Sequence, residues 1–290
     1  MKKQLFFIAT LLCILFSSCS VEKIAIAGSG WQEIAIVDKK TGAIEWKHQL
    51  ADGEECNDIE VTPHGDILYA YGHGARLIKR DHSTIWDYKA NEKEEIHTVS
   101  RLKKGGYLVG VCGDPARIVE LDSKGNVTKE VKFRTMNFDI HNQFRHIEKN
   151  DSNIYLIPLM DKKKIMRVTP EGNYKGNLAV GFEAYMAKTL ENKKLVISCG
   201  KDKLFLVLDP LRPQVDKTIY TREVKGASLR FVGEIHLCKN GNIYIANGNL
   251  QDDEISSSLL IEVDPLCNVV WSLPFNREIK NITSVYQFFE

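Results

Sequence analysis

The sequence lacks the short motifs by which many enzymes and metal proteins are recognised. It contains no GxSxG, HExxH or CxxC pattern, which excludes the common signatures of serine hydrolases, zinc proteases and zinc-binding cysteine pairs. It also lacks an excess of either charge: 39 Lys and Arg stand against 38 Asp and Glu, so no global field favours nucleic acid or an anionic membrane. We therefore predict no nucleic-acid partner, and any function must depend on residues that folding brings together.

The most apolar segment, residues 5–16, is too short at 12 residues to span a bilayer. Lys2 and Lys3 precede it, and the small residues Ser17, Ser18 and Cys19 follow it. This order of positive charge, apolar run and small residues predicts a secretory signal that is removed from the mature protein.

Residues 16–19 resemble a bacterial lipobox, whose cysteine becomes the acylated first residue of the mature chain. The resemblance implies that residues 1–19 are a lipoprotein signal peptide with Cys19 lipidated, and that residues 20–290 form a single domain. It also implies a location in the bacterial cell envelope, on the outer membrane and facing the periplasm or the cell surface. The acyl anchor would be the only contact with a membrane.

The spacing of the cysteines does not predict a metal site. Five thiols would remain after cleavage and lipidation, at Cys56, Cys112, Cys199, Cys238 and Cys267. An odd number in an exported chain leaves at least one thiol unpaired within the molecule, and we expect these side chains to be buried as small apolar groups. Neither their spacing nor the acidic run at 252–254 matches a zinc or EF-hand calcium motif. The sequence therefore predicts no metal site and no cofactor.

What the sequence does contain is a pattern of four short strands that recurs six times. In the clearest copy, residues 56–90, four apolar runs are separated by turn clusters rich in Gly, Pro, Asp and Ser. The residue that enters the turn after the third run recurs at intervals of 42, 42, 47, 40 and 55 residues, at Asp38, Arg80, Asp122, Thr169, Asp209 and Asp264. A period of about 40–50 residues with four strands per unit predicts a β-propeller.

The first copy is incomplete, because no strand precedes the one at 23–27. The carboxyl end supplies a lone strand at 281–288 with nothing after it. We therefore predict an all-β, six-bladed propeller of four-stranded antiparallel sheets, closed by pairing the C-terminal strand with the N-terminal blade. Closure removes the exposed edges that invite aggregation. The other five blades are expected at 56–90, 95–133, 144–180, 184–220 and 231–275.

Residues 38–46 carry a further resemblance. A third strand that ends in Asp38, a Thr41-Gly42 turn and Trp46 four residues later are similar to the repeat of the PQQ-like (quinoprotein) propeller superfamily. The resemblance implies the fold but no quinone cofactor, since the adjacent cysteines and calcium ligands of the quinone-dependent dehydrogenases are absent.

The predicted propeller has two different faces. Tight, uniform turns lie on one face, and irregular loops and blade connectors lie on the other, where binding sites usually occur. The innermost strands begin on the loop-rich face, and their polar residues there are the candidate site: Asn57, Asp58, His97, Arg145, His146 and Glu234. Since neighbouring strand residues point to opposite sides, only one of Asn57 and Asp58, and one of Arg145 and His146, should face the channel. Trp31 and His73 are added from the loops as ligand-binding candidates.

Two classes of function fit this arrangement. The first is a binding module whose ligand is a small molecule, a carbohydrate or a protein. The alternative is a small transferase, hydrolase or lyase that uses His97, Arg145 and His146 with an acid from Asp58 or Glu234. Residues 86 and 97–105 resemble the repeat of arylsulfotransferase-type six-bladed propellers. That resemblance implies that His97 attacks a sulfate ester, while Arg145 and His146 hold the sulfuryl oxygens.

Overall fold

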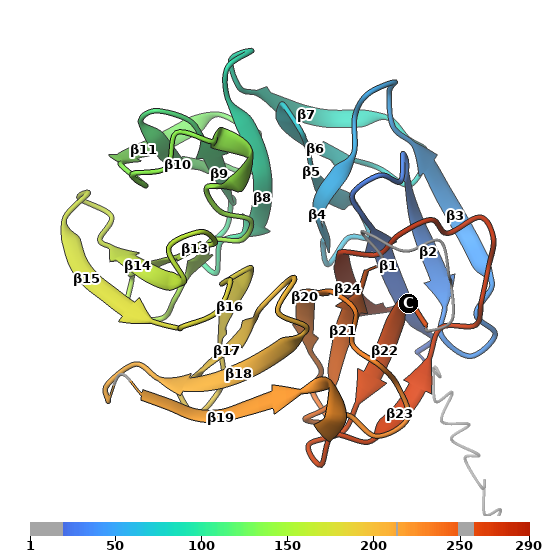
Figure 1. The fold of residues 1–290 in the computed structure, drawn as a ribbon. Coiled ribbons are helices and arrows are strands. Elements are labelled where there is room, and N and C mark those ends of the chain that lie inside the picture. The colour runs from blue at the N-terminus through green and yellow to red at the C-terminus, as the bar shows by residue number, and fades with distance from the viewer. Residues whose placement is uncertain (1–19, 213, 249–257) are drawn as a thin grey trace, which may run out of the picture.

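The computed structural model describes residues 20–212, 214–248 and 258–290. Within these ranges the chain forms six four-stranded antiparallel sheets arranged around a central axis, with two single-turn 3₁₀ helices between them (Figure 1). The predicted six-bladed, all-β propeller is confirmed. No helix in the described part of the chain is long and apolar enough to cross a membrane. The predicted signal peptide, Cys19 and the acidic run at 252–254 lie outside the described residues.

The blades are numbered in chain order. Their strands are, from the channel outward, β24 (Ser284–Phe289), β1 (Glu22–Ala27), β2 (Glu33–Asp38) and β3 (Ile44–Gln49) in blade 1; β4 (Cys56–Val61), β5 (Ile67–Tyr71), β6 (Gly74–Ile78) and β7 (Thr84–Lys89) in blade 2; β8 (Glu95–Arg101), β9 (Tyr107–Cys112), β10 (Ala116–Leu121) and β11 (Val127–Phe133) in blade 3; β12 (Glu148–Lys149), β13 (Tyr155–Leu159), β14 (Lys164–Val168) and β15 (Tyr174–Ala179) in blade 4; β16 (Met186–Thr189), β17 (Leu195–Ser198), β18 (Leu204–Asp209) and β19 (Gln214–Tyr220) in blade 5; and β20 (Val232–Leu237), β21 (Ile243–Asn247), β22 (Leu260–Val263) and β23 (Val269–Ser272) in blade 6. The helices are η1 (Ile140–Asn142) and η2 (Thr221–Glu223).

The ring closes as the sequence predicts. β24 is the innermost strand of blade 1 and pairs antiparallel with β1, so that Val285 lies opposite Ile26 (Figure 1). The backbone bonds continue past the strand ends, where the amides of Val21 and Glu290 each donate to the other residue's carbonyl, at 2.8 and 3.0 Å. The two ends of the chain therefore complete one sheet, and that sheet joins the first blade to the last.

The core is divided among the blade junctions. Six apolar clusters of buried residues occur in the described chain, and each one packs two neighbouring sheets face to face. The strongly apolar second strands fit this position, because both of their faces are covered. The five cysteines predicted to be buried and apolar are buried and unpaired, so no disulfide assists the packing.

The residue that sets the repeat period closes the turn after the third strand. The Asp38 carboxylate accepts hydrogen bonds from the amide and hydroxyl of Thr41, at 2.7 and 2.8 Å. In blade 3 the Asp122 carboxylate accepts from the amide of Lys124 at 2.8 Å. A short carboxylate bound to an amide two or three residues later is the usual way that Asp stabilises a turn, which explains why Asp recurs with the repeat.

The tryptophan of the repeat joins one blade to the next. The indole Nε1 of Trp46 in blade 1 donates to the carbonyl of Arg80 in blade 2, at 2.8 Å, and Trp271 in blade 6 donates to the carbonyl of Lys39 in blade 1, at 3.1 Å. Each acceptor lies in the third-to-fourth turn of the neighbouring blade. The motif that resembles the PQQ-like repeat is therefore a structural element of blade packing.

Blade 4 departs from the predicted pattern. Its innermost strand was expected from residue 144, but β12 contains only Glu148 and Lys149. Upstream of it, the Arg145 guanidinium donates to the carbonyls of Phe144, at 3.2 Å, and of His141. These carbonyls are engaged by a side chain instead of a neighbouring strand, and residues 144–147 follow an irregular path.

Closure of the ring is testable with one substitution. Val285→Asp should lower the free energy of unfolding by more than about 3 kcal/mol, because it places a charge without a partner in a fully buried position of β24. Phe289→Asp, in the same strand but 49% exposed, is the matched control. Urea unfolding measures both variants; equal midpoints for the two would contradict the proposed importance of the closing strand.

Candidate functional site

Six residues occupy equivalent positions on the inner edges of the six blades and form what we call the inner ring. They are Asp58, Thr98, His146, Met186, Glu234 and Ser284. All six side chains are buried. Beta-bulges interrupt β4, β8 and β20 beside these positions, and bulges commonly redirect side chains near functional sites.

Five members of the inner ring accept a hydrogen bond from a backbone amide of the next blade. The acceptor side chains and their donors are Ser284 with Ile59, Asp58 with Val99, Thr98 with Ile147, Met186 with Ile235 and Glu234 with Val285, at 2.9–3.4 Å. His146 is the exception within the described chain. The inner ring therefore joins the blades around the channel and is interrupted at one position.

The interruption brings three titratable side chains together. Nδ1 of His146 lies 3.4 Å from Oδ2 of Asp58, and one ligand atom from each of Asp58, His146 and Glu234 lies within 4.8 Å of the other two. Burial raises the pKa of Glu234 to about 7, and the negative charge of Asp58 adds to this effect. Burial opposes protonation of His146, but the charges of Asp58 and Glu234 outweigh it and raise the pKa of His146 above its usual value.

A second polar layer follows along the channel. Nε of Arg101 lies 3.1 Å from Oε2 of Glu60, and its Nη2 donates to the Tyr286 hydroxyl at 2.5 Å. Oε2 of Glu148 accepts from the Thr189 amide at 2.8 Å. Desolvation is the main cause that raises the pKa of both Glu60 and Glu148. This layer is consistent with a channel interior that carries more carboxylates than cations.

Both layers line a cavity of about 940 Å³. It reaches Asp58, His146 and Glu234 at one end and the turns at 103–106 and 150–153 at the other. These are first-to-second strand turns, so the cavity opens on the tight-turn face. We predicted the loop-rich face. Three of the residues that we predicted there, Asp58, His146 and Glu234, nevertheless line this cavity.

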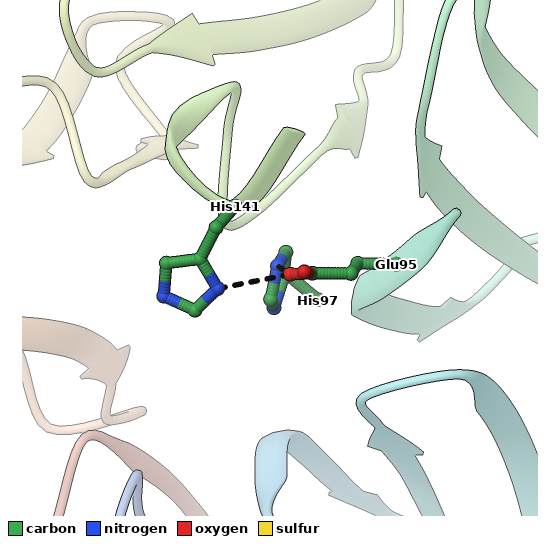
Figure 2. A group of neighbouring side chains, drawn as sticks. All are labelled: Glu95, His97 and His141. Carbon is green, nitrogen blue, oxygen red and sulfur yellow. Dashed lines mark hydrogen bonds and ion pairs between the residues drawn. The ribbon is translucent and has the colours of Figure 1, made fainter. Parts of the chain in front are cut away.

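Glu95, His97 and His141 form the cluster at the loop-rich end (Figure 2). Oε2 of Glu95 accepts from Nε2 of His97 at 2.7 Å and from Nδ1 of His141 at 2.9 Å. These hydrogen bonds hold the pKa of Glu95 well below its usual range. Burial and the Arg145 charge lower the pKa of His97 to about 4, against the opposing effect of Glu95. His97 is therefore neutral at pH 7.

The predicted alternation of neighbouring residues holds at both pairs. Asp58 and His146 line the cavity, whereas Asn57 and Arg145 do not, although both are buried. Nη1 of the Arg145 guanidinium donates to backbone carbonyls, as described above. His97 lies apart from His146, in the cluster of Figure 2.

Two candidates from the loops do not reach the cavity. The Trp31 ring is 3% exposed and packs in the apolar cluster between blades 6 and 1, so it is not available for ligand stacking. His73 is exposed, and its Nδ1 lies 2.8 Å from the carbonyl of Glu94. We correct the assignment of Trp31, which stabilises a junction; His73 lies outside the cavity and binds the blade connector.

Sequence reasoning missed several cavity residues. Glu60 and Glu148 lie two positions after Asp58 and His146, on the same side of their strands, and a consistent use of period two would have found them. Lys188 has the same relation to Met186. Ser284 would have emerged from aligning the closing strand with the other innermost strands. These residues come together from blades that are far apart in the sequence, so no local sequence pattern reveals that they line one cavity.

Comparison with known proteins gives a family and a fold. A family model described as Mal s 1 allergenic protein-like matches residues 30–251. A crystal structure from Bacteroides caccae, of a protein of unknown function, is 30% identical, covers 93% of this chain and 99% of its own, and has a TM-score of 0.89. No curated protein matches the sequence.

Two lyase structures share the fold at low identity. A streptogramin B lyase is 11% identical, with 92% of this chain and 84% of its own covered and a TM-score of 0.64. A catalytically inactive virginiamycin B lyase from Staphylococcus aureus, with quinupristin, is 11% identical, with 95% and 94% covered and a TM-score of 0.57. Identity this low supports a shared architecture and nothing finer.

The neutral state of buried His97 predicts a dependence of stability on pH. Because the pKa of His97 is about 4 in the folded state and about 6.5 when unfolded, only the unfolded chain takes up a proton here between those values. The contribution of His97 to the free energy of unfolding is constant above pH 6.5. It falls by up to about 1.4 kcal/mol per pH unit on acidification towards pH 4.

His97→Gln should reduce this loss of stability between pH 6.5 and pH 4, because Gln keeps a donor for Glu95 and does not titrate. His64→Gln, at an exposed turn position, is the control and should leave the pH dependence of the unfolding free energy unchanged. Urea unfolding at pH 7, 6 and 5 tests both variants. If the unfolding free energies of the wild type and His97→Gln fall equally with pH, His97 is already protonated in the folded state.

Proposed function

The chain belongs to the Mal s 1 allergenic protein-like family, and from that premise and the channel geometry we propose that it is a propeller that binds a small polar ligand in its central cavity. The observation that carries the proposal is the cavity of about 940 Å³, which is lined by buried carboxylates and by partly buried or exposed cations. Ligand pockets are typically recessed, of 300–1,000 Å³, and contain a few convergent polar groups. A carbohydrate or a short peptide is the class of ligand that such a lining favours.

The ligand class can be found and the site tested together. In a thermal-shift screen of sugars, short peptides and sulfate esters, a ligand of the cavity should raise the melting temperature of the wild type. Arg101→Gln should weaken binding of that ligand about tenfold or more, because Arg101 lines the cavity. Arg117→Gln is the matched control, since Arg117 lies in the same blade and also pairs with glutamates, Glu94 and Glu130, without lining the cavity.

An equal loss of affinity in both Arg variants would show that the substitutions weaken binding by destabilising blade 3 and not by removing a contact with the ligand. A screen in which no compound shifts the melting temperature of the wild type would count against the binding proposal itself. The two outcomes are separated by titrating any active compound directly against each variant.

Catalysis of the transferase, hydrolase or lyase type is the second candidate. The observation in its favour is that three of the five residues predicted for catalysis, Asp58, His146 and Glu234, meet in one cavity, where Glu234 has a pKa of about 7. A carboxyl group with that pKa suits proton transfer near neutral pH, and two structural relatives are lyases by name. The form in which His97 attacks a sulfate ester is less favoured, because His97 is bound to Glu95 outside this group.

We further propose that the protein is exported to the bacterial cell envelope and anchored through Cys19. Cys19→Ala should transfer it from the membrane pellet to the soluble fraction of lysed cells, because a lipobox without its cysteine cannot be acylated. Continued sedimentation of the variant with membranes would contradict the anchor. Cys56→Ala, which removes a buried thiol of the propeller, is the control and should leave the distribution unchanged.

A further inference from the structure

The irregular position in the inner ring has an unused nitrogen. His146 is 93% buried, its Nδ1 faces Asp58, and its Nε2 has no hydrogen-bond partner. A buried polar atom without a partner costs free energy, and native structures contain few of them. The imidazole therefore has one buried nitrogen whose electron pair or proton no hydrogen bond in the described chain satisfies.

The two carboxylates beside it each keep one oxygen free. Oδ2 of Asp58 accepts from the Val99 amide, and Oε2 of Glu234 accepts from Ser284 Oγ and the Val285 amide. These bonds orient the carboxylates, and no hydrogen bond in the described chain uses Oδ1 of Asp58 or Oε1 of Glu234. Metal ligands are commonly held in this way, with hydrogen bonds to the atom that does not bind the ion.

The part of the cavity beside this group has more carboxylates than cations. Four carboxylates line this part of the cavity, on Asp58, Glu60, Glu148 and Glu234, against two cations, on Arg101 and Lys188. Nζ of Lys188 lies 4.0 Å from Oε1 of Glu234, too far for a hydrogen bond. One divalent cation would balance the two negative charges that remain when Glu234 is ionised and His146 is neutral, which are the forms in which these groups bind a metal.

We propose that Asp58, His146 and Glu234 bind one divalent cation of the manganese-to-zinc series at the inner end of the cavity. Two carboxylate oxygens and one imidazole nitrogen are a donor set for these ions, whereas an all-oxygen set would favour Mg²⁺ or Ca²⁺. Three protein ligands leave coordination positions for water or for a bound molecule on the cavity side. The site does not require the ligand proposed above, because the ion compensates charges that are already present.

The cluster of Figure 2 is the natural comparison. Ligand atoms of Glu95, His97 and His141 are equally close together, but both imidazoles already donate to one oxygen of Glu95. The Glu95 oxygen is thus occupied without an ion, although Nδ1 of His97, like Nε2 of His146, has no hydrogen-bond partner. The cluster also differs in composition, with two imidazoles where the inner-ring group has one, and this difference can be measured.

The experiment uses the full chain from residue 20, stripped with EDTA and dialysed. Calorimetric titration with Mn²⁺, and separately with Zn²⁺, should show one ion per chain. His146→Gln should weaken binding at least about 100-fold, whereas His141→Gln in the comparison cluster should change it less than twofold. Electron spin-echo spectroscopy of the Mn²⁺ complex of the wild type should detect one imidazole nitrogen.

Absence of binding up to millimolar Mn²⁺ and Zn²⁺, two coordinated imidazoles, or loss of binding in His141→Gln alone would each overturn the proposal. The spectroscopic count needs no variant, so it decides the question even if His146→Gln does not fold. Ion binding in a protein that no organic compound stabilises would support the cation site and contradict the ligand proposal, which keeps the two results separate.

Discussion

The innermost strands of this propeller each have an edge without a neighbouring strand, and the rest of the structure depends on how those edges are satisfied. A buried amide needs an acceptor, and in five of the six junctions the inner ring supplies one from the adjacent blade. The polar residues of the channel are therefore first of all structural. Closure through β24 belongs to the same system, because Ser284 and Val285 connect blade 1 to blades 2 and 6.

That structural pattern is interrupted at one position. His146 occupies a ring position but binds no amide of the next blade, and it lies beside two carboxylates, each of which has one oxygen held by a backbone amide of the ring. The neighbouring bonds make the position of the carboxylates rigid without using all of their lone pairs. A preorganised set of donors of this kind is what a bound ion or a polar ligand requires.

The two ends of the channel differ in what they leave available. At the loop-rich end, Glu95, His97 and His141 bind one another, and Nη1 of Arg145 is engaged by carbonyls. At the tight-turn end, a cavity of about 940 Å³ is lined by polar side chains, and among its described lining residues His146 has a buried nitrogen without a hydrogen-bond partner, as His97 has at the other end. The cavity therefore opens beside the tight turns, whereas we predicted the site on the face of the irregular loops. The fold alone, shared with lyases at 11% identity, does not decide between binding and catalysis.

The sequence by itself determined the architecture. The period of the turn-entering residue, the alternation within strands and the unmatched strands at the two ends predict six blades and their closure, because each depends on local hydrogen bonding and on burial of one strand after another. It also identified Asp58, His146 and Glu234 as polar residues on inner strands. Only the tertiary structure decided that these three meet while His97 does not, which face opens, and that Trp31 is buried. Those outcomes depend on bulges, on the irregular start of blade 4 and on contacts between blades about 40–50 residues or more apart, where small shifts of the backbone decide which side chains can touch.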